Sequence, residues 1–124
     1  MKFLKISFII TSAVFFTLPL KAQKRVEKDS IKVYGNCIMC KRRIEASLFD
    51  TKGIKAVEWN VHTKNMFVAY RPDKISKEEI HKIVAKVGHD TEQAKAPDSV
   101  YTELPFCCLY RDHDPHTSEE RSKH

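Results

Sequence analysis

Two stretches of the chain repeat apolar residues at the spacing of an α-helix. In the first, which runs from about Met39, apolar residues recur every four positions and charged residues take the other faces. The second begins with a capping box, Ser76 followed by Glu79, and Gly88 is placed to end it. His81 falls on the surface of this second helix and is given no role. The pattern predicts two amphipathic helices whose buried stripes are Cys40, Ile44 and Leu48 in the first, and Ile80, Ile83, Val84 and Val87 in the second.

Four other segments have the alternation, or the β-branched and aromatic content, of strands: residues 31–34, 54–61, 65–70 and 91–94. The polar connection from Asn60 to Asn65 predicts a hairpin between the middle two. The order of elements is then β-α-β-β-α-β, which predicts an α+β, ferredoxin-like sandwich over residues 30–96. Residues 97–110 follow as a short C-terminal extension that contains two cysteines and a helical turn.

The two ends of the chain lack the pattern of a folded domain. Residues 1–22 combine a cationic start, a 15-residue mostly apolar run and a small residue, Ala22, after which a signal peptidase would cut. A membrane anchor is the alternative, but the run is shorter than the ~20 apolar residues that span a bilayer. We therefore expect a cleaved signal peptide and a periplasmic or secreted protein. Residues 23–29 are expected to be a flexible leader, and residues 111–124 a disordered tail.

The charge of the chain argues against a nucleic-acid-binding protein. The formal net charge is +6, and it falls to +3 if Lys2, Lys5 and Lys21 leave with the signal peptide. No concentrated stripe of Lys and Arg remains, and no carboxylate pair, Ser/His/Asp set or phosphate loop suggests an enzyme. We expect a monomeric protein with one small core that meets membranes only through a partner.

The four cysteines form two close pairs, Cys37 with Cys40 and Cys107 with Cys108. Disulfides within these pairs would close very small loops and would restrict the unfolded chain little, so a chemical role explains them better. The first pair lies between a predicted strand and a helix N-terminus, where the helix dipole and the basic residues 41–43 favour thiolates. Two thiolates suit a soft ion such as Cu(I) or Hg(II), whereas Zn(II) would need four ligands.

The run Gly35-Asn36-Cys37-Ile38-Met39-Cys40, its helical continuation to residue 45, and the later segments 53–59, 68–70 and 87–90 carry a resemblance. Together they resemble the heavy-metal-associated domain, a family of copper chaperones, metal-binding domains of P-type ATPases and periplasmic mercury-binding proteins. The resemblance implies that Cys37 and Cys40 bind one ion, Cu(I) first among the candidates, and pass it by ligand exchange to a metal-transporting membrane protein or another acceptor. Gly35 stands where the family usually has a methionine that packs beneath the loop.

Three further residues are candidates for the metal site. His89 follows the second helix at the same end as the cysteine loop, so it could be a third ligand, a donor to a ligand, or a solvated turn residue. The extension could bring Cys107 and Cys108 back to the loop, where four sulfurs would favour Zn(II), Cd(II) or a Cu(I) cluster and a sequestering role. Alternatively, these two cysteines are buried against the sheet or bonded to the first pair. The sequence leaves the choice between delivery and sequestration open.

Thiol–disulfide exchange in the periplasm is the alternative function for Cys37 and Cys40, and an inert disulfide is a third interpretation. A thioredoxin-like protein also places two cysteines at a helix start, but it needs a longer series of strands and helices. Here a predicted hairpin follows the first helix directly. Metal binding is therefore the preferred interpretation.

Overall fold

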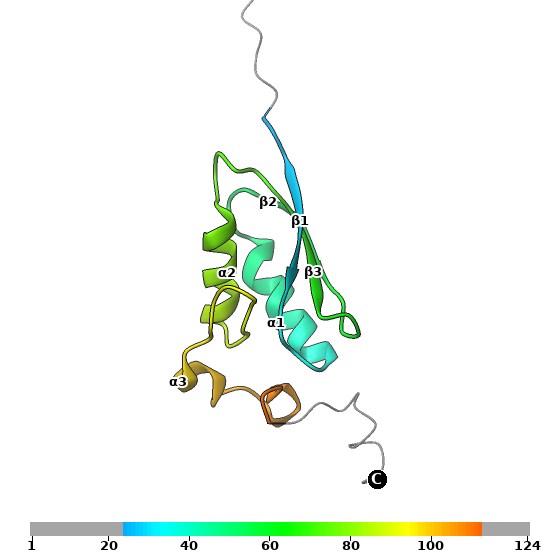
Figure 1. Ribbon diagram of the computed structural model, residues 1–124, viewed down its shortest axis with the longest axis vertical. Helices are drawn as coiled ribbons and strands as arrows, with labels where there is room; N and C mark the ends of the chain where they lie inside the picture. The colour runs from blue at the N-terminus through cyan, green and yellow to red at the C-terminus, as the bar shows by residue number, and fades with distance from the viewer. Residues whose placement is uncertain (1–23, 113–124) are drawn as a thin grey trace, which may run out of the picture.

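The computed structural model describes residues 24–112, in which two helices cover one face of a three-stranded antiparallel sheet (Figure 1). The strands lie in the order β1-β3-β2, and their bounds are β1 (Glu27–Lys32), β2 (Ile54–Trp59) and β3 (Asn65–Tyr70). The helices are α1 (Ile38–Phe49) and α2 (Lys77–Lys86). The predicted α+β class and the predicted hairpin between β2 and β3 are confirmed.

The apolar stripes of both helices pack on the sheet. Cys40, Ile44 and Leu48 of α1 are fully buried, as their spacing predicts. They form the core with residues of α2 and of the strands, chiefly Ile31, Trp59, Met66, Val68, Ile80 and Val84. The helix positions that carry these stripes therefore follow directly from the hydrophobic pattern.

The capping box at the start of α2 is also confirmed. The Glu79 N–H donates to Ser76 Oγ at 3.2 Å, and the Ser76 N–H donates to Glu79 Oε2 at 2.8 Å. One prediction for this helix is wrong, because His81 is 1% exposed and not on the surface. Its Nδ1 lies 2.7 Å from Oγ1 of Thr91, so a neighbouring loop covers this side of the helix.

Strand β1 begins earlier than predicted. It pairs with β3 along its whole length, from Glu27 opposite Tyr70 to Lys32 opposite Asn65. The prediction that residues 23–29 form a flexible leader is therefore wrong for the last three. Polar side chains hold these residues in place: the Tyr70 hydroxyl donates to Glu27 at 3.2 Å, and Lys77 on α2 forms an ion pair with Asp29 at 2.7 Å.

The fourth predicted strand, residues 91–94, is reduced to one bridge between Val33 and Thr91 in the described part of the chain. The side chain of Thr91 explains the difference, because its Oγ1 accepts the N–H groups of Gln93 at 3.2 Å and Ala94 at 2.9 Å. The Thr91 N–H also donates to the Ala94 carbonyl at 2.8 Å. These contacts fold the segment into a turn, since backbone groups paired locally are unavailable to a sheet.

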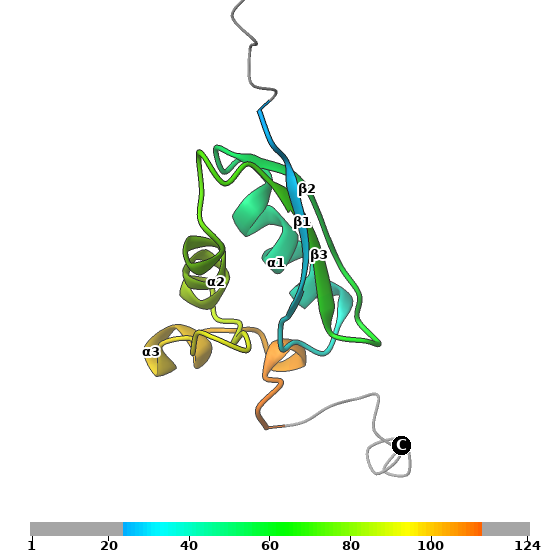
Figure 2. The same cartoon turned by 45° about the horizontal axis from the view of Figure 1, so that its top comes forward.

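The C-terminal extension lies across the end of the molecule where β1 leads into α1 (Figure 2). It contains a short helix, α3 (Asp98–Tyr101), and a 3₁₀ turn, η1 (Phe106–Cys108). The predicted helical turn is thus present, although it is shorter than residues 98–104.

Hydrogen bonds from Arg111 hold the C-terminal extension against the rest of the domain. Its guanidinium makes two hydrogen bonds to Asp90, at 2.7 and 2.9 Å, and a third to Asp98 at 2.9 Å. The same group lies over the ring of Tyr101, 4.2 Å from its centre. Burial raises the pKa of Asp90, but the hydrogen bonds from Arg111 and the Ala96 N–H, together with the nearby positive charges, outweigh it and the net pKa is lowered. The predicted disordered tail, residues 111–124, therefore starts too early, because Arg111 is fixed by these contacts.

Two predicted segments fall outside the described residues: the signal peptide over residues 1–22 and the rest of the tail from residue 113. Within residues 24–112, no helix has the length and apolar character needed to cross a bilayer.

Candidate metal centre

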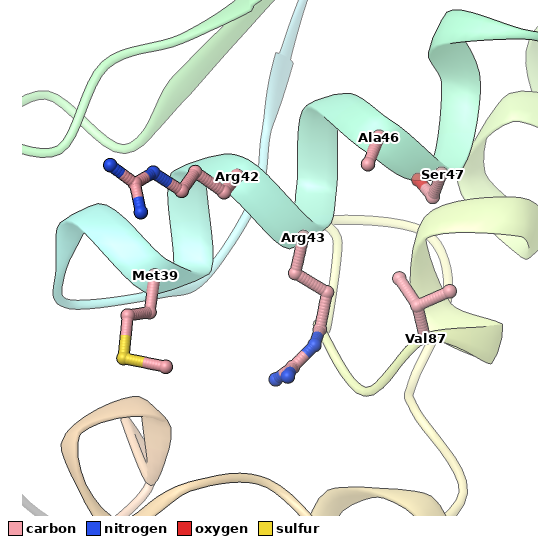
Figure 3. A pocket seen from close by; sticks show the side chains of 6 residues that line it. All are labelled: Met39, Arg42, Arg43, Ala46, Ser47 and Val87. Atoms are coloured by element: carbon pink, nitrogen blue, oxygen red, sulfur yellow. The ribbon is translucent and has the colours of Figure 1, made fainter.

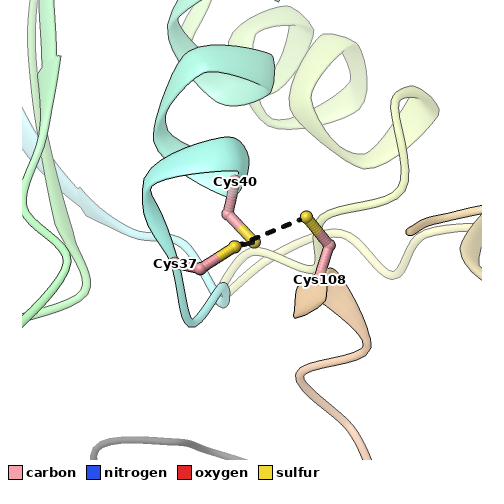
Figure 4. Close-up of side chains that lie close together, drawn as sticks. All are labelled: Cys37, Cys40 and Cys108. Carbon is pink, nitrogen blue, oxygen red and sulfur yellow. Dashed lines mark hydrogen bonds between the residues drawn. The ribbon is translucent and has the colours of Figure 1, made fainter. Parts of the chain in front are cut away.

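Cys37 and Cys40 lie where the chain passes from β1 into α1. Cys37 is the N-cap of the helix, with an extended backbone, and Cys40 lies in the first turn. Their sulfurs are 3.4 Å apart, and both cysteines are free thiols. The predicted two-sulfur loop is thus present, with both sulfurs directed to one point (Figure 4).

The extension brings a third sulfur to this point. Cys108 Sγ lies 3.6 Å from Cys37 Sγ, and the sulfurs of Cys37, Cys40 and Cys108 all lie within 4.8 Å of one another. Three sulfurs around one ion, each bound at about 2.3 Å as in zinc thiolates, would be separated by about 4.0 Å. The two shorter spacings, 3.4 and 3.6 Å, lie within about 0.6 Å of that value and none exceeds 4.8 Å, so small side-chain shifts would let all three bind one ion.

Burial and hydrogen bonding together set the acidity of the three thiols. Cys40 and Cys108 are fully buried, and Cys37 is partly exposed. Burial raises the pKa of Cys37, but hydrogen bonds from the Cys40 N–H and the Cys40 and Cys108 thiols outweigh it, so the net pKa is lowered. Burial raises the pKa of Cys40 and of Cys108, and for Cys108 the neighbouring thiols raise it further. Cys37 is therefore the first of the three to ionise, and binding of a metal would release the protons that the three thiols carry.

Trp59 supports the cysteine loop from beneath, and its role was not apparent from the sequence. A Cβ on Gly35 would lie 3.0 Å from Cys40 Cβ and 3.2 Å from the Trp59 ring. The indole is fully buried, and its Nε1–H donates to the Val33 carbonyl at 3.0 Å. The indole thus fills the space beneath the loop, which explains why this chain has Gly35 where a methionine is usual in the resembled family.

Asn36 is a second residue that sequence reasoning missed. It is fully buried directly before the first cysteine, and the Cys40 thiol donates to its Oδ1 at 3.4 Å. A buried amide at this point gives the Cys40 thiol a partner when no ion is bound.

His89 does not join the sulfurs. It is fully buried, its Nδ1 donates to the Tyr34 carbonyl at 2.9 Å, and its ring stacks on Tyr110 with centres 5.4 Å apart. It is not part of the group of converging ligand atoms in residues 24–112, which consists of the three cysteines. The structure favours none of the three roles left open by the sequence. His89 is not among the converging ligands, its Nδ1–H donates to a backbone carbonyl and not to a ligand, and its side chain is buried and not solvated. It fixes the backbone at Tyr34, which leads into the cysteine loop.

Cys107 is also outside that group. Its Sγ lies 4.0 Å from Cys108 Sγ and 3.4 Å from Met39 Sδ, on the outer side of the three sulfurs. Of the five predicted metal-site residues, the structure therefore brings together Cys37, Cys40 and Cys108.

The buried His89 predicts a loss of stability in acid. Burial lowers its pKa from 6.5 to about 4. Between these values the unfolded chain binds a proton that the folded chain does not, so stability falls as the pH drops, by about 2 kcal/mol from pH 7 to pH 5. Urea unfolding of the metal-free protein at both pH values should show that His89→Gln loses correspondingly less stability than wild type. His62→Gln changes an exposed histidine and serves as the control; parallel pH curves for wild type and His89→Gln would contradict the prediction.

Comparison with known proteins gives no matching family model. The chain is 32% identical over 70 residues to a copper-exporting P-type ATPase from Staphylococcus saprophyticus; the match covers 56% of this chain and 9% of the ATPase. Among solved structures, the N-terminal domain of a potential copper-translocating P-type ATPase from Bacillus subtilis in the Cu(I)-loaded state is 26% identical, with a TM-score of 0.52 over 54% of this chain and 85% of that one. Oxidised MerP from Ralstonia metallidurans, 19% identical, has the same fold, with a TM-score of 0.52 over 55% of this chain and 96% of its own. Fold and relatives together confirm the resemblance to the heavy-metal-associated domain family that the sequence predicts.

Proposed function

We propose that the protein is an exported metallochaperone that holds one Cu(I) ion on the thiolates of Cys37, Cys40 and Cys108. The observation that carries the proposal is the convergence of three sulfurs from two distant parts of the chain on one point. Thiolates are the ligands that Cu(I) prefers, and this ion accepts a low coordination number. The Cu(I)-loaded state of the Bacillus subtilis domain supports the choice of ion.

Zn(II) fits this donor set less well. Structural zinc sites are almost always four-coordinate, whereas the converging group in residues 24–112 has three members. Hg(II) shares the preference for sulfur, and the two P-type ATPase relatives, whose descriptions refer to copper, favour Cu(I) over Hg(II) in this proposal.

The third thiolate would change how the ion is released. A site of Cys37 and Cys40 alone would lie open at the helix start, but η1 covers it and places the buried Cys108 over it. Release then requires an acceptor thiolate that displaces Cys108 while the ion stays on the loop. The acceptor that we propose is a metal-transporting membrane protein, in keeping with the copper-exporting ATPase among the relatives.

Removal of the third thiolate tests the proposal. In an anaerobic titration of the reduced protein with Cu(I) against a chromogenic chelator, Cys108→Ser is expected to weaken binding of the first ion at least about tenfold. Groups that merely hydrogen-bond to metal ligands already contribute 10–100-fold. Cys107→Ser changes the adjacent cysteine and is the control, with the first-ion affinity of wild type.

Two results would contradict the proposal. If Cys108→Ser bound the first ion as tightly as wild type, Cys108 would not be a ligand. If the reduced protein bound no soft metal but reduced insulin disulfides, the alternative of thiol–disulfide exchange through Cys37 and Cys40 would replace metal binding.

A further inference from the structure

The row of sulfurs continues outward beyond the three-sulfur group. Cys107 Sγ lies 4.0 Å from Cys108 Sγ, and Met39 Sδ lies 3.4 Å from Cys107 Sγ. Met39 is 43% exposed and Cys107 is partly exposed, whereas Cys108 is fully buried. Five sulfur atoms thus form a continuous path from the interior of the domain to its surface.

Local structure explains how adjacent cysteines reach different places. In a 3₁₀ helix successive side chains are about 120° apart, so Cys108 faces the loop while Cys107 faces outward. Met39 lies in the first turn of α1, between the two loop cysteines in sequence. Its side chain points from α1 toward the extension (Figure 3).

We propose that Cys107 and Met39 form a second, outer Cu(I) site that shares the Cys108 thiolate with the inner one. This inference rests on the proposed function, because the shared thiolate is a ligand of the inner ion. Thiolate and thioether sulfur are the donors that select Cu(I) among metal ions.

The spacing suits such a site. The 4.0 Å between the sulfurs of Cys107 and Cys108 equals the separation of about 4.0 Å expected for two thiolates on one ion with bonds of about 2.3 Å. The sulfurs of Cys107 and Met39, at 3.4 Å, are closer than this and would have to move apart by about 0.6 Å. Met39 can do so, because its side chain is exposed and has three rotatable bonds.

The charges also favour a second cation. Three thiolates around one Cu(I) carry a net charge of −2, which attracts another positive ion to the adjacent sulfurs. Filling both sites converts four thiols to thiolates, releases four protons to solvent and binds two ions, with no change of oxidation state. The outer ion is held by a partly exposed thiolate, a shared thiolate and a neutral thioether, so it binds more weakly than the inner one and exchanges first.

Counting the ions bound by matched variants tests the outer site. Reduced wild type, Met39→Leu and Cys107→Ser are titrated anaerobically with Cu(I), with native mass spectrometry to count ions and a competing chelator to measure affinity. Wild type is expected to bind two ions, the second at least about tenfold more weakly than the first, a difference of about 1.4 kcal/mol. Both variants are expected to bind one ion with wild-type affinity. Ile38→Leu, at the exposed position beside Met39, is the control and keeps two.

The results separate this inference from the proposed function. A wild-type protein that binds a single ion, or a second ion retained by either variant, would overturn the outer site and leave the inner one standing. A protein that binds no Cu(I) at all would remove the proposed function, and the outer site with it. Because Met39→Leu exchanges one exposed apolar side chain for another of similar size, loss of the fold does not account for a lost ion.

Discussion

In a Cys107→Ser background, which lacks the outer site, Cys37→Ser/Cys40→Ser is expected to abolish tight Cu(I) binding, with a loss of affinity for the first ion of more than about a thousandfold, equivalent to about 4 kcal/mol. Both thiolates supplied by the loop are lost, so only Cys108 remains of the three converging sulfur ligands. The competition titration described for Cys108→Ser measures the affinity for the first ion. The loss of affinity should far exceed the loss caused by Cys108→Ser alone.

The fold is expected to survive this double substitution. A serine hydroxyl at position 40 can still donate to Asn36 Oδ1, which now accepts from the Cys40 thiol at 3.4 Å. A thermal melt of the metal-free variant close to that of wild type would confirm that binding, and not folding, is lost. Retention of the first ion by the well-folded variant would show that the inner site lies elsewhere.

Gly35→Met is expected to destabilise the protein by about 3 kcal/mol, even though methionine is the usual residue here in the resembled family. Even the first atom of the new side chain would press on Cys40 and on the Trp59 ring, at 3.0 and 3.2 Å. The ring cannot withdraw easily, because its Nε1–H is hydrogen-bonded to the Val33 carbonyl and its backbone N–H to Glu45. Inserting a side chain into a packed core in this way costs about 1–3 kcal/mol, and methionine adds three more heavy atoms beyond the Cβ.

A double-mutant cycle tests the physical reason for that loss. If Gly35 and Trp59 share one space, then Gly35→Met/Trp59→Val should be clearly more stable than the sum of the two single effects predicts. Urea unfolding of the four proteins measures the coupling, and Gly35→Ala provides a smaller step of the same kind. Additive effects, or a Gly35→Met variant as stable as wild type, would show that the indole does not exclude the methionine.

The elements that were predicted correctly are those specified by local chemistry. The Ser76–Glu79 capping box and the every-fourth-residue stripe of α1 depend on residues within one or two turns of each other, and both are present. The errors at the two ends of the domain arose where contacts between distant segments decide, whereas the predicted strand 91–94 was lost to local hydrogen bonds of Thr91. Residues Glu27 to Asp29 look like a polar leader, yet β3 and α2 supply partners for them.

The candidate site divides in the same way. The loop of Cys37 and Cys40 follows from spacing and from its position between a strand and a helix. The position of Cys108 does not, because it depends on Arg111 holding the extension against Asp90, across 21 residues. The support from Trp59 was equally hidden, since a tryptophan in a predicted strand indicates burial without showing what it packs beneath.

The sulfurs of Cys37 and Cys108 come from positions 71 residues apart. An ion bound to both would act as a reversible cross-link that closes a loop of that length, as a disulfide would. In the chain-entropy treatment of cross-links, a loop of this size is worth roughly 4 kcal/mol of folding free energy. Ion binding and folding would then stabilise each other, so the metal-free protein would be the form that unfolds and is degraded most readily.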